Sequence, residues 1–203
     1  MIVVIDYNVG NVKSVRNALH YIGLREKLSA DPVDIESADG IILPGVAAFG
    51  YAIRALGATA EVVKAVARAG KPILGICVGF QLLFERSCEM GDHEGLGLIG
   101  GEVKAIPPGR TIPHMGWNAV GTQDIDLFAG MNREEHFYFA HSYYADVADP
   151  EARVAWTDYD MEIAAGVQKN NVFGVQFHPE KSSTAGLQVL RNFEAICRRG
   201  RAC

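Results

Sequence analysis

Short apolar runs alternate with helical patterns along the first half of the chain. Residues 2–5 (Ile-Val-Val-Ile), 40–43 (Gly-Ile-Ile-Leu) and 72–76 (Pro-Ile-Leu-Gly-Ile) are almost unbroken apolar segments, which is typical of strands buried on both faces. The segments between them carry apolar residues three or four positions apart, as amphipathic helices do. Strands that alternate with helices pair in parallel, so this half predicts a sheet with helices on both faces.

Two of these helices have well-marked ends. The first is expected over residues 12–21 and is stopped by Gly23; the second runs from Thr59 to Ala69 and is ended by Gly70. Thr59 is expected to cap the second helix. The inner face of that helix is expected to carry Val62, Val63, Val66 and Ala69.

The second half of the chain has a different pattern. From about Gly95 the segments are short and strand-like, with Gly, Pro, Asp and Asn between them. Residues 162–168 and 172–177 flank Lys-Asn-Asn, which is a hairpin signal. Ser182 or Ser183 can cap a last helix. That helix is expected to bury Leu187, Leu190, Phe193 and Ile196.

Size and composition fit these patterns. The 203 residues are 49% hydrophobic and 21% charged, which excludes a disordered or fibrous chain. We expect residues 1–203 to form one α/β domain, with a central, mostly parallel sheet flanked by helices and antiparallel strands in the C-terminal half. The net charge of −5, without a long Lys/Arg run, argues against nucleic-acid binding.

The length of the apolar runs, the N-terminal segment and the spacing of the cysteines indicate where the protein is located and whether it binds a metal. No apolar run approaches about 18 residues, so no membrane span is expected. The start of the chain reads as a strand and not as a signal peptide, and a cytoplasmic location is expected. The cysteines at positions 77, 88, 197 and 203 show no CxxC spacing, so no metal site is expected. Cys88 and Cys197 are interpreted as small buried hydrophobes.

Cys77 has a more specific setting. In Gly75-Ile-Cys77-Val78-Gly79, a nucleophilic residue lies between two glycines, where a buried strand is expected to turn into a helix. Such a turn aims the sulfur into a cleft, the helix N-terminus favours the thiolate, and the Val78 N–H can bind an oxyanion. A buried cysteine beside packing glycines is the structural alternative.

A nucleophilic cysteine needs a base, and His178 is the best candidate of the six histidines. Pro179 holds His178 in an extended backbone, where residues two apart point the same way. Glu180 can therefore meet the imidazole, fix its tautomer and stabilise its charged form. A surface histidine near an acidic residue is the plainer alternative.

These two segments resemble the signatures of class I glutamine amidotransferases. The residues are Gly75-Ile-Cys-Val-Gly-Phe-Gln-Leu-Leu and Gly174-Val-Gln-Phe-His-Pro-Glu, and Leu43-Pro-Gly-Val resembles the oxyanion strand of that family. The match covers essentially the whole chain. It implies a flavodoxin-like fold and hydrolysis of L-glutamine to L-glutamate and ammonia, with no metal or organic cofactor.

The same resemblance implies roles for individual residues. Cys77, His178 and Glu180 would form the catalytic triad. Backbone around Gly45, Val46 and Val78 would hold the oxyanion. Gln81, His141, Ser142 and Tyr143 would line the glutamine pocket, although in a structural reading Gln81 is an exposed helix residue and Ser142 and Tyr143 are strand-end polar groups.

Three further segments are similar to glutaminase subunits of imidazole glycerol phosphate synthases. They begin at Asp6 (Asp-Tyr-Asn-Val-Gly-Asn), Ile112 (Ile-Pro-His-Met-Gly-Trp-Asn) and Phe137 (Phe-Tyr-Phe-Ala-His-Ser-Tyr-Tyr). The similarity implies a heterodimer with a (β/α)8 cyclase subunit of the HisF type, which would use the ammonia. The residues expected near this partner are Asn8, Asn11, Met115, Trp117, Tyr138 and Lys181.

One position departs from the family pattern, and two other functions stay open. Ala47 stands where the family usually has glycine, which restricts positive φ in the oxyanion strand or moves its hinge to Gly45. The glutaminase of another amidotransferase, such as pyridoxal phosphate synthase, would share the triad but lack the Ile112 segment. A stand-alone cysteine hydrolase is the second alternative.

Overall fold

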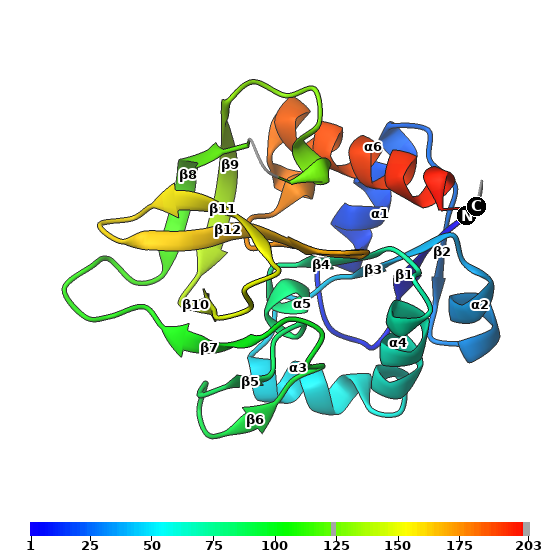
Figure 1. The fold of residues 1–203 in the computed structure, drawn as a ribbon, viewed down its shortest axis with the longest axis horizontal. Coiled ribbons are helices and arrows are strands. Elements are labelled where there is room, and N and C mark those ends of the chain that lie inside the picture. The colour runs from blue at the N-terminus through cyan, green and yellow to red at the C-terminus, as the bar shows by residue number, and fades with distance from the viewer. Residues whose placement is uncertain (123–124, 201–203) are drawn as a thin grey trace.

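A seven-stranded sheet crosses the middle of the molecule (Figure 1), in a computed structural model that describes residues 1–122 and 125–200. Its strands are β1 (Ile2–Ile5), β2 (Glu26–Ser29), β3 (Gly40–Leu43), β4 (Ile73–Ile76), β11 (Arg153–Asp158), β12 (Glu162–Lys169) and β13 (Val172–Val175). Their order is β11-β12-β13-β4-β3-β1-β2. The five strands from β13 to β2 are parallel, and β11 and β12 add an antiparallel edge.

The parallel part has the strand order of a flavodoxin-like fold, because β2-β1-β3-β4-β13 is 2-1-3-4-5 in chain order. Every residue of β1, β3, β4 and β13 is buried, as their unbroken apolar runs predict. The predicted fold class is therefore confirmed.

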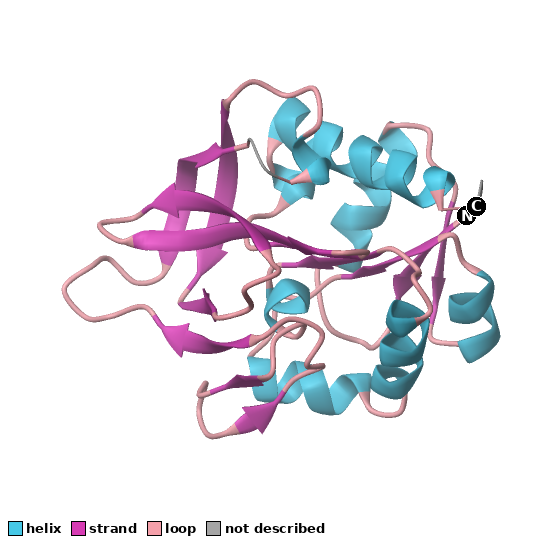
Figure 2. Ribbon diagram, viewed as in Figure 1, coloured by secondary structure: helices cyan, strands magenta, loops and turns pink. Residues whose placement is uncertain are grey.

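Helices cover both faces of this sheet (Figure 2). They are α1 (Val12–Tyr21), α2 (Pro32–Ser37), α3 (Phe49–Leu56), α4 (Thr59–Arg68), α5 (Val78–Gln81) and α6 (Ser183–Arg199), with 3-10 turns η1 (Asp126–Phe128) and η2 (Pro179–Lys181). In the views of Figures 1 and 2, α1 and α6 lie above the sheet, and α3, α4 and α5 lie below it. In the described part of the chain, no helix is both long and apolar enough to cross a membrane.

Two smaller sheets lie beyond the carboxyl ends of the parallel strands, at the left of Figure 1. One has the order β10-β7-β5-β6, from β5 (Arg86–Ser87), β6 (His93–Glu94), β7 (Gly101–Ala105) and β10 (Tyr143–Val147). The other is an antiparallel pair, β8 (His114–Gly121) and β9 (Glu134–His141). Ligands of open α/β sheets bind at the carboxyl ends of the strands, so these sheets build walls around that position.

Most of the predicted elements are confirmed. The bounds of β1, α1 and β3 agree with the prediction, and the predicted hairpin is formed by β12 and β13, with Asn170 at a φ of 52° in its turn. The second strand of that hairpin ends at Val175, two residues earlier than predicted.

Two details of α4 differ from the prediction. Thr59 is the first helical residue and not a cap, because Ala58 before it already has helical φ and ψ and no side chain caps this end. Ala69 lies beyond the last turn and is exposed, and Ala67 takes the inner position instead.

Two further side chains also differ from expectation. Cys88, which follows the two-residue strand β5, is exposed and not buried as predicted, whereas Cys197 is buried as predicted; Cys203 lies outside the described residues. Ser182 precedes α6, but its hydroxyl donates to the His178 carbonyl and accepts the Tyr138 N–H at 2.9 Å, so it does not cap the helix.

Candidate active site

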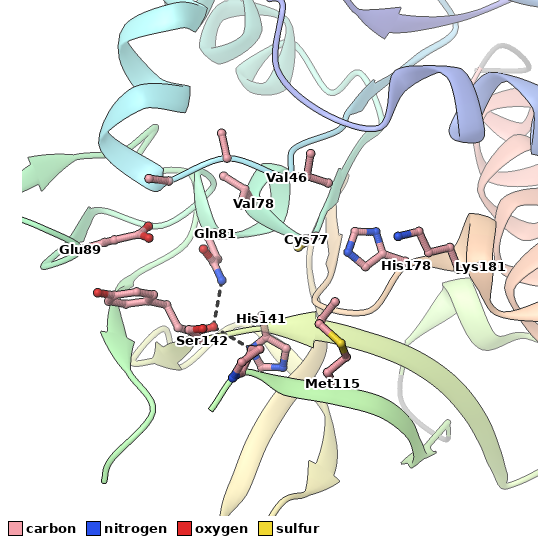
Figure 3. A pocket seen from close by; sticks show the side chains of 15 residues that line it. Val46, Cys77, Val78, Gln81, Glu89, Met115, His141, Ser142, His178 and Lys181 are labelled. Carbon is pink, nitrogen blue, oxygen red and sulfur yellow. Dashed lines mark hydrogen bonds between the residues drawn. The ribbon is translucent and has the colours of Figure 1, made fainter. Parts of the chain in front are cut away.

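Cys77 lies at the carboxyl end of β4, where the chain turns into α5 (Figure 3). Its backbone has a φ of 54° and a ψ of −108°, a conformation that a residue with a side chain rarely adopts, and its side chain is 4% exposed. Strain of this kind costs on the order of 1–3 kcal/mol and is concentrated at functional sites. The structure therefore has the strained strand-to-helix turn of a nucleophile elbow.

The two flanking glycines are required by close backbone contacts. A Cβ on Gly75 would lie 2.5 Å from the Gly79 carbonyl oxygen, and a Cβ on Gly79 would lie 1.8 Å from the Leu43 carbonyl oxygen. Both neighbours are backbone atoms, which cannot swing aside as a flexible side chain can. The glycine spacing therefore reflects the packing of this turn against the end of β3.

His178 and Glu180 reach the site from the loop after β13. The His178 Nδ1 lies 2.9 Å from Glu180 Oε1, and their side chains are 3% and 1% exposed. Burial by itself lowers the pKa of His178, but hydrogen bonds to Cys77 and Glu180 and their negative charges raise this pKa to about 10. The three predicted residues thus meet in one buried, hydrogen-bonded group.

A glutamine that sequence reasoning missed also reaches the sulfur. Gln176 is fully buried and its amide Nε2 lies 3.8 Å from Cys77 Sγ. The amide Nε2 of Gln81 donates to Gln176 Oε1 and to the Tyr143 carbonyl, both at 2.9 Å. Gln81 is 3% exposed, so the alternative of an exposed helix residue is wrong. Gln176 lies two positions before His178, and residues two apart in an extended chain point the same way, so the sequence contained a signal for its position.

The segment after β3 packs against the elbow. The Val78 N–H donates to the Gly45 carbonyl at 3.3 Å, so this predicted oxyanion donor is already engaged. The Tyr7 hydroxyl donates to the Pro44 carbonyl in the same segment. Val46 is 51% exposed at the cavity rim.

A cavity of about 430 Å³ opens over Cys77 (Figure 3). All the residues predicted for glutamine binding line it: Gln81, His141, Ser142 and Tyr143. Burial lowers the pKa of His141 to about 3, so this ring is neutral at physiological pH. Glu89 also lines the cavity, and its Oε2 accepts the Phe49 N–H at 2.7 Å; no local sequence pattern predicts this role.

Two of the predicted partner residues, Met115 and Lys181, line this cavity, and Trp117 and Tyr138 lie beside them. Met115 and Trp117 are 62% and 51% exposed on β8, and the Trp117 ring lies 6.1 Å from the Tyr138 ring. Lys181 lies over that tyrosine, with its Nζ 5.7 Å from the ring centroid. The loop that carries Asn8 and Asn11 comes close to Gly45, since a Cβ on Gly10 between them would lie 3.3 Å from the Gly45 nitrogen.

The chemistry of this site is that of a cysteine nucleophile with a charged base. Within residues 1–122 and 125–200, no group of three or more His, Cys, Asp or Glu side chains is arranged to hold a metal ion. A buried thiol paired with an imidazole and a carboxylate can attack a carbonyl carbon and form a thioester. The polar groups across the cavity can hold a small, polar substrate over the sulfur.

Known proteins are similar to this chain over almost its whole length. It matches the glutamine amidotransferase class-I family over residues 3–196. It is 50% identical over 200 residues to the imidazole glycerol phosphate synthase subunit HisH of Lacticaseibacillus casei, covering 97% of this chain and 96% of that protein. The subunit of the same name from Methanothermobacter thermautotrophicus is 46% identical over 199 residues, covering 98% and 100%.

The fold is also found among solved structures. The structure of PurLQS from Thermotoga maritima matches with a TM-score of 0.76 and 25% identity, covering 96% of this chain and 97% of that one. The elbow at Cys77, the cavity above it and these similarities agree with one another. The chain belongs to the class I glutamine amidotransferase family and, within it, to the HisH subunits of imidazole glycerol phosphate synthase.

Proposed function

We propose that the cavity binds L-glutamine and that Cys77 hydrolyses its side-chain amide, giving L-glutamate and ammonia. The ammonia passes to a (β/α)8 cyclase subunit of the HisF type. That partner uses it to convert phosphoribulosyl-formimino-aminoimidazole-carboxamide ribonucleotide (PRFAR) into imidazole glycerol phosphate and aminoimidazole carboxamide ribonucleotide, in L-histidine biosynthesis. The buried, hydrogen-bonded group of Cys77, His178 and Glu180 below the cavity is the observation that carries this proposal.

The reaction proceeds in two steps. The Cys77 thiolate attacks the amide carbon, the C–N bond breaks, and His178 gives its proton to the departing nitrogen, which leaves as ammonia. Water then attacks the γ-glutamyl thioester while His178 takes up one of its protons, the C–S bond breaks, and glutamate leaves with the Cys77 thiolate regenerated. Glu180 orients the imidazole and stabilises its charged form, as their 2.9 Å contact supports.

The oxyanion that forms in each step needs two N–H donors. The Val78 N–H is the nearest to the sulfur along the chain, and freeing it requires the Gly45 carbonyl to turn away. Gly45 is the natural hinge, because a glycine adopts either peptide orientation. Among the described residues Ala47 is not one of those with positive φ, so alanine fits this resting conformation.

Charge and hydrogen bonding in the cavity fit the α-amino-acid end of glutamine. The Glu89 carboxylate lines the cavity and can pair with the α-ammonium group. Ser142, with the backbone of Tyr143, lies across the cavity from Val46 and can bind the polar backbone end of the substrate.

The exposed apolar residues at the mouth support a partner there. Met115 and Trp117 form an apolar rim next to Tyr138 and Lys181, and aromatic anchors of this kind carry much of the affinity in protein interfaces. The loop that carries Asn8 and Asn11 approaches Gly45, which directly precedes the cavity residue Val46. We assign this face to the cyclase subunit, in a heterodimer. The cytoplasmic location stays a prediction.

The test is glutamate release by the chain with and without a HisF-type barrel and PRFAR. A one-to-one complex and a rise in turnover of at least about tenfold on adding PRFAR are expected, which needs about 1.4 kcal/mol of coupling. Cys77→Ser should abolish the release and leave the fold intact. Full release by Cys77→Ser, or no complex at tens of micromolar protein, would overturn the assignment.

A further inference from the structure

A continuous chain of buried hydrogen-bonding groups connects strand β8 with the cavity. His114 Nδ1 lies 2.9 Å from His141 Nε2, and His141 Nδ1 lies 2.8 Å from the Tyr143 carbonyl oxygen. That oxygen also accepts the Gln81 amide at 2.9 Å, and Figure 3 shows both dashed lines, from His141 and from Gln81, meeting at this oxygen. The two histidines face each other directly in the β8–β9 register.

The Tyr143 carbonyl, at the end of this series of hydrogen bonds, determines which nitrogen of each histidine carries the proton. A backbone carbonyl only accepts, so His141 must carry its proton on Nδ1. Because burial keeps His141 neutral, its Nε2 is an acceptor, and His114 must donate from Nδ1. Asn118 Oδ1 lies 3.0 Å from the other nitrogen of His114; burial lowers the pKa of this ring, and the contact with Asn118 offsets only part of that effect.

The packing around His114 fixes its ring in this orientation. The side chain is fully buried and lies between two aromatic rings, with centroids 3.9 Å from Tyr159 and 4.7 Å from Phe139, both stacked. Both rings restrict its rotation, so the Nδ1 stays directed at His141. No solvent reaches this position to replace the donor if His114 loses it.

The two residues that flank His114 in the sequence face the cavity and not the buried interior. Pro113 and Met115 both line the cavity, and Met115 is 62% exposed at its mouth. Successive residues of a strand point to opposite faces, so His114 points inward between them. One short segment therefore contributes to the cavity rim and, through His114, to the far wall of the cavity.

We propose that His114 is a positioning residue for glutamine binding. Its Nδ1–H holds His141, and His141 together with Gln81 fixes the Tyr143 carbonyl and thereby the Ser142–Tyr143 wall of the cavity. This inference rests on the proposed function, because it assigns that wall to the substrate. It also connects the position of the partner-facing strand β8 to the shape of the substrate pocket.

The experiment measures KM and kcat for glutamine in the complex with a HisF-type barrel and PRFAR. His114→Phe keeps a ring between Phe139 and Tyr159 but removes both nitrogens. His114→Asn keeps a donor at the position of Nδ1. His136→Phe, on the exposed side of β9, is the matched control.

We expect His114→Phe to raise KM at least fivefold with kcat changed less than threefold, and His114→Asn to restore KM to within about twofold of wild type. His136→Phe should leave both constants unchanged. Equal KM values for wild type and His114→Phe, or no recovery with His114→Asn, would refute the proposal. A wild-type complex that releases no glutamate would instead refute the proposed function.

A second measurement decides the matter if His114→Phe does not fold. The tautomers of both rings in the wild-type chain are read from ¹⁵N chemical shifts and long-range couplings. We expect His141 to be neutral with its proton on Nδ1 at pH 7. A proton on Nε2 of His141 would break the chain at its centre and contradict the proposal.

Discussion

Replacing Gly79 by alanine tests the packing that creates the elbow. Its added Cβ would lie 1.8 Å from the Leu43 carbonyl oxygen, 2.7 Å from the Leu43 carbonyl carbon and 3.2 Å from the Pro44 carbonyl carbon. All three atoms are backbone at the end of β3, so relief requires α5 and β3 to separate by more than about an ångström, given ordinary packing distances.

The expected cost follows from that displacement. Overpacking of a core costs about 1–3 kcal/mol, and backbone neighbours place Gly79→Ala at the upper end, near ~3 kcal/mol. Alanine is about 1 kcal/mol better than glycine in a helix, which offsets only part of this. For a chain of this size, a net loss of about 2 kcal/mol lowers Tm by roughly 4–8 °C.

The assay is thermal unfolding of Gly79→Ala beside a matched control. Gly121 ends β8, and a Cβ there meets nothing within 4 Å, so Gly121→Ala should change the free energy of unfolding by less than about 0.5 kcal/mol. Glutaminase turnover should fall at least about tenfold in Gly79→Ala, because Leu43 leads directly into the Gly45 segment. A Gly79→Ala chain as stable and active as Gly121→Ala would refute this reasoning.

Three further predictions address the charges and the partner face. Wild type should lose its stability advantage over His178→Asn as the pH rises from about 6.5 through about 10, by up to about 1.4 kcal/mol per pH unit. The reason is that the pKa of His178 is raised in the folded chain, so only the folded chain keeps this proton in that range. A difference in Tm that does not change with pH would contradict this prediction. Glu180→Gln should cut turnover about 10- to 100-fold and lower the pKa of His178, read from the pH–rate profile, whereas wild-type turnover would make Glu180 a spectator. Trp117→Ala should weaken binding of the barrel at least about tenfold, as measured by titration, and leave the alkylation of Cys77 by iodoacetamide unchanged. An unaltered affinity would show that Trp117 is not part of the interface.

The parts of the site that a short stretch of sequence determines were predictable. The elbow depends on glycines two residues either side of Cys77, and the pairing of His178 with Glu180 depends on an extended backbone. Both patterns are complete within a few residues. The same is true of the buried strands, whose apolar runs need no knowledge of their neighbours.

Elements that depend on distant residues were missed. β2 is a short, half-exposed edge strand of sequence Glu-Lys-Leu-Ser, without an apolar run, and α2 after it has only six residues. The first N–H of α3 is satisfied by Glu89, which is 40 residues away, so no local cap marks its start. The contact between His114 and His141 needs the β8–β9 register, which the sequence of neither strand determines alone.

We propose that Cys77 releases ammonia from glutamine for a partner subunit. The most direct test incubates the chain with a HisF-type barrel, PRFAR and glutamine labelled with ¹⁵N at its side-chain amide, and follows the label by mass spectrometry. We expect ¹⁵N in imidazole glycerol phosphate, in equal amount to the glutamate formed, and none of either with Cys77→Ser. Label that stays in glutamine with the wild-type chain, or that reaches the product with Cys77→Ser, would contradict it.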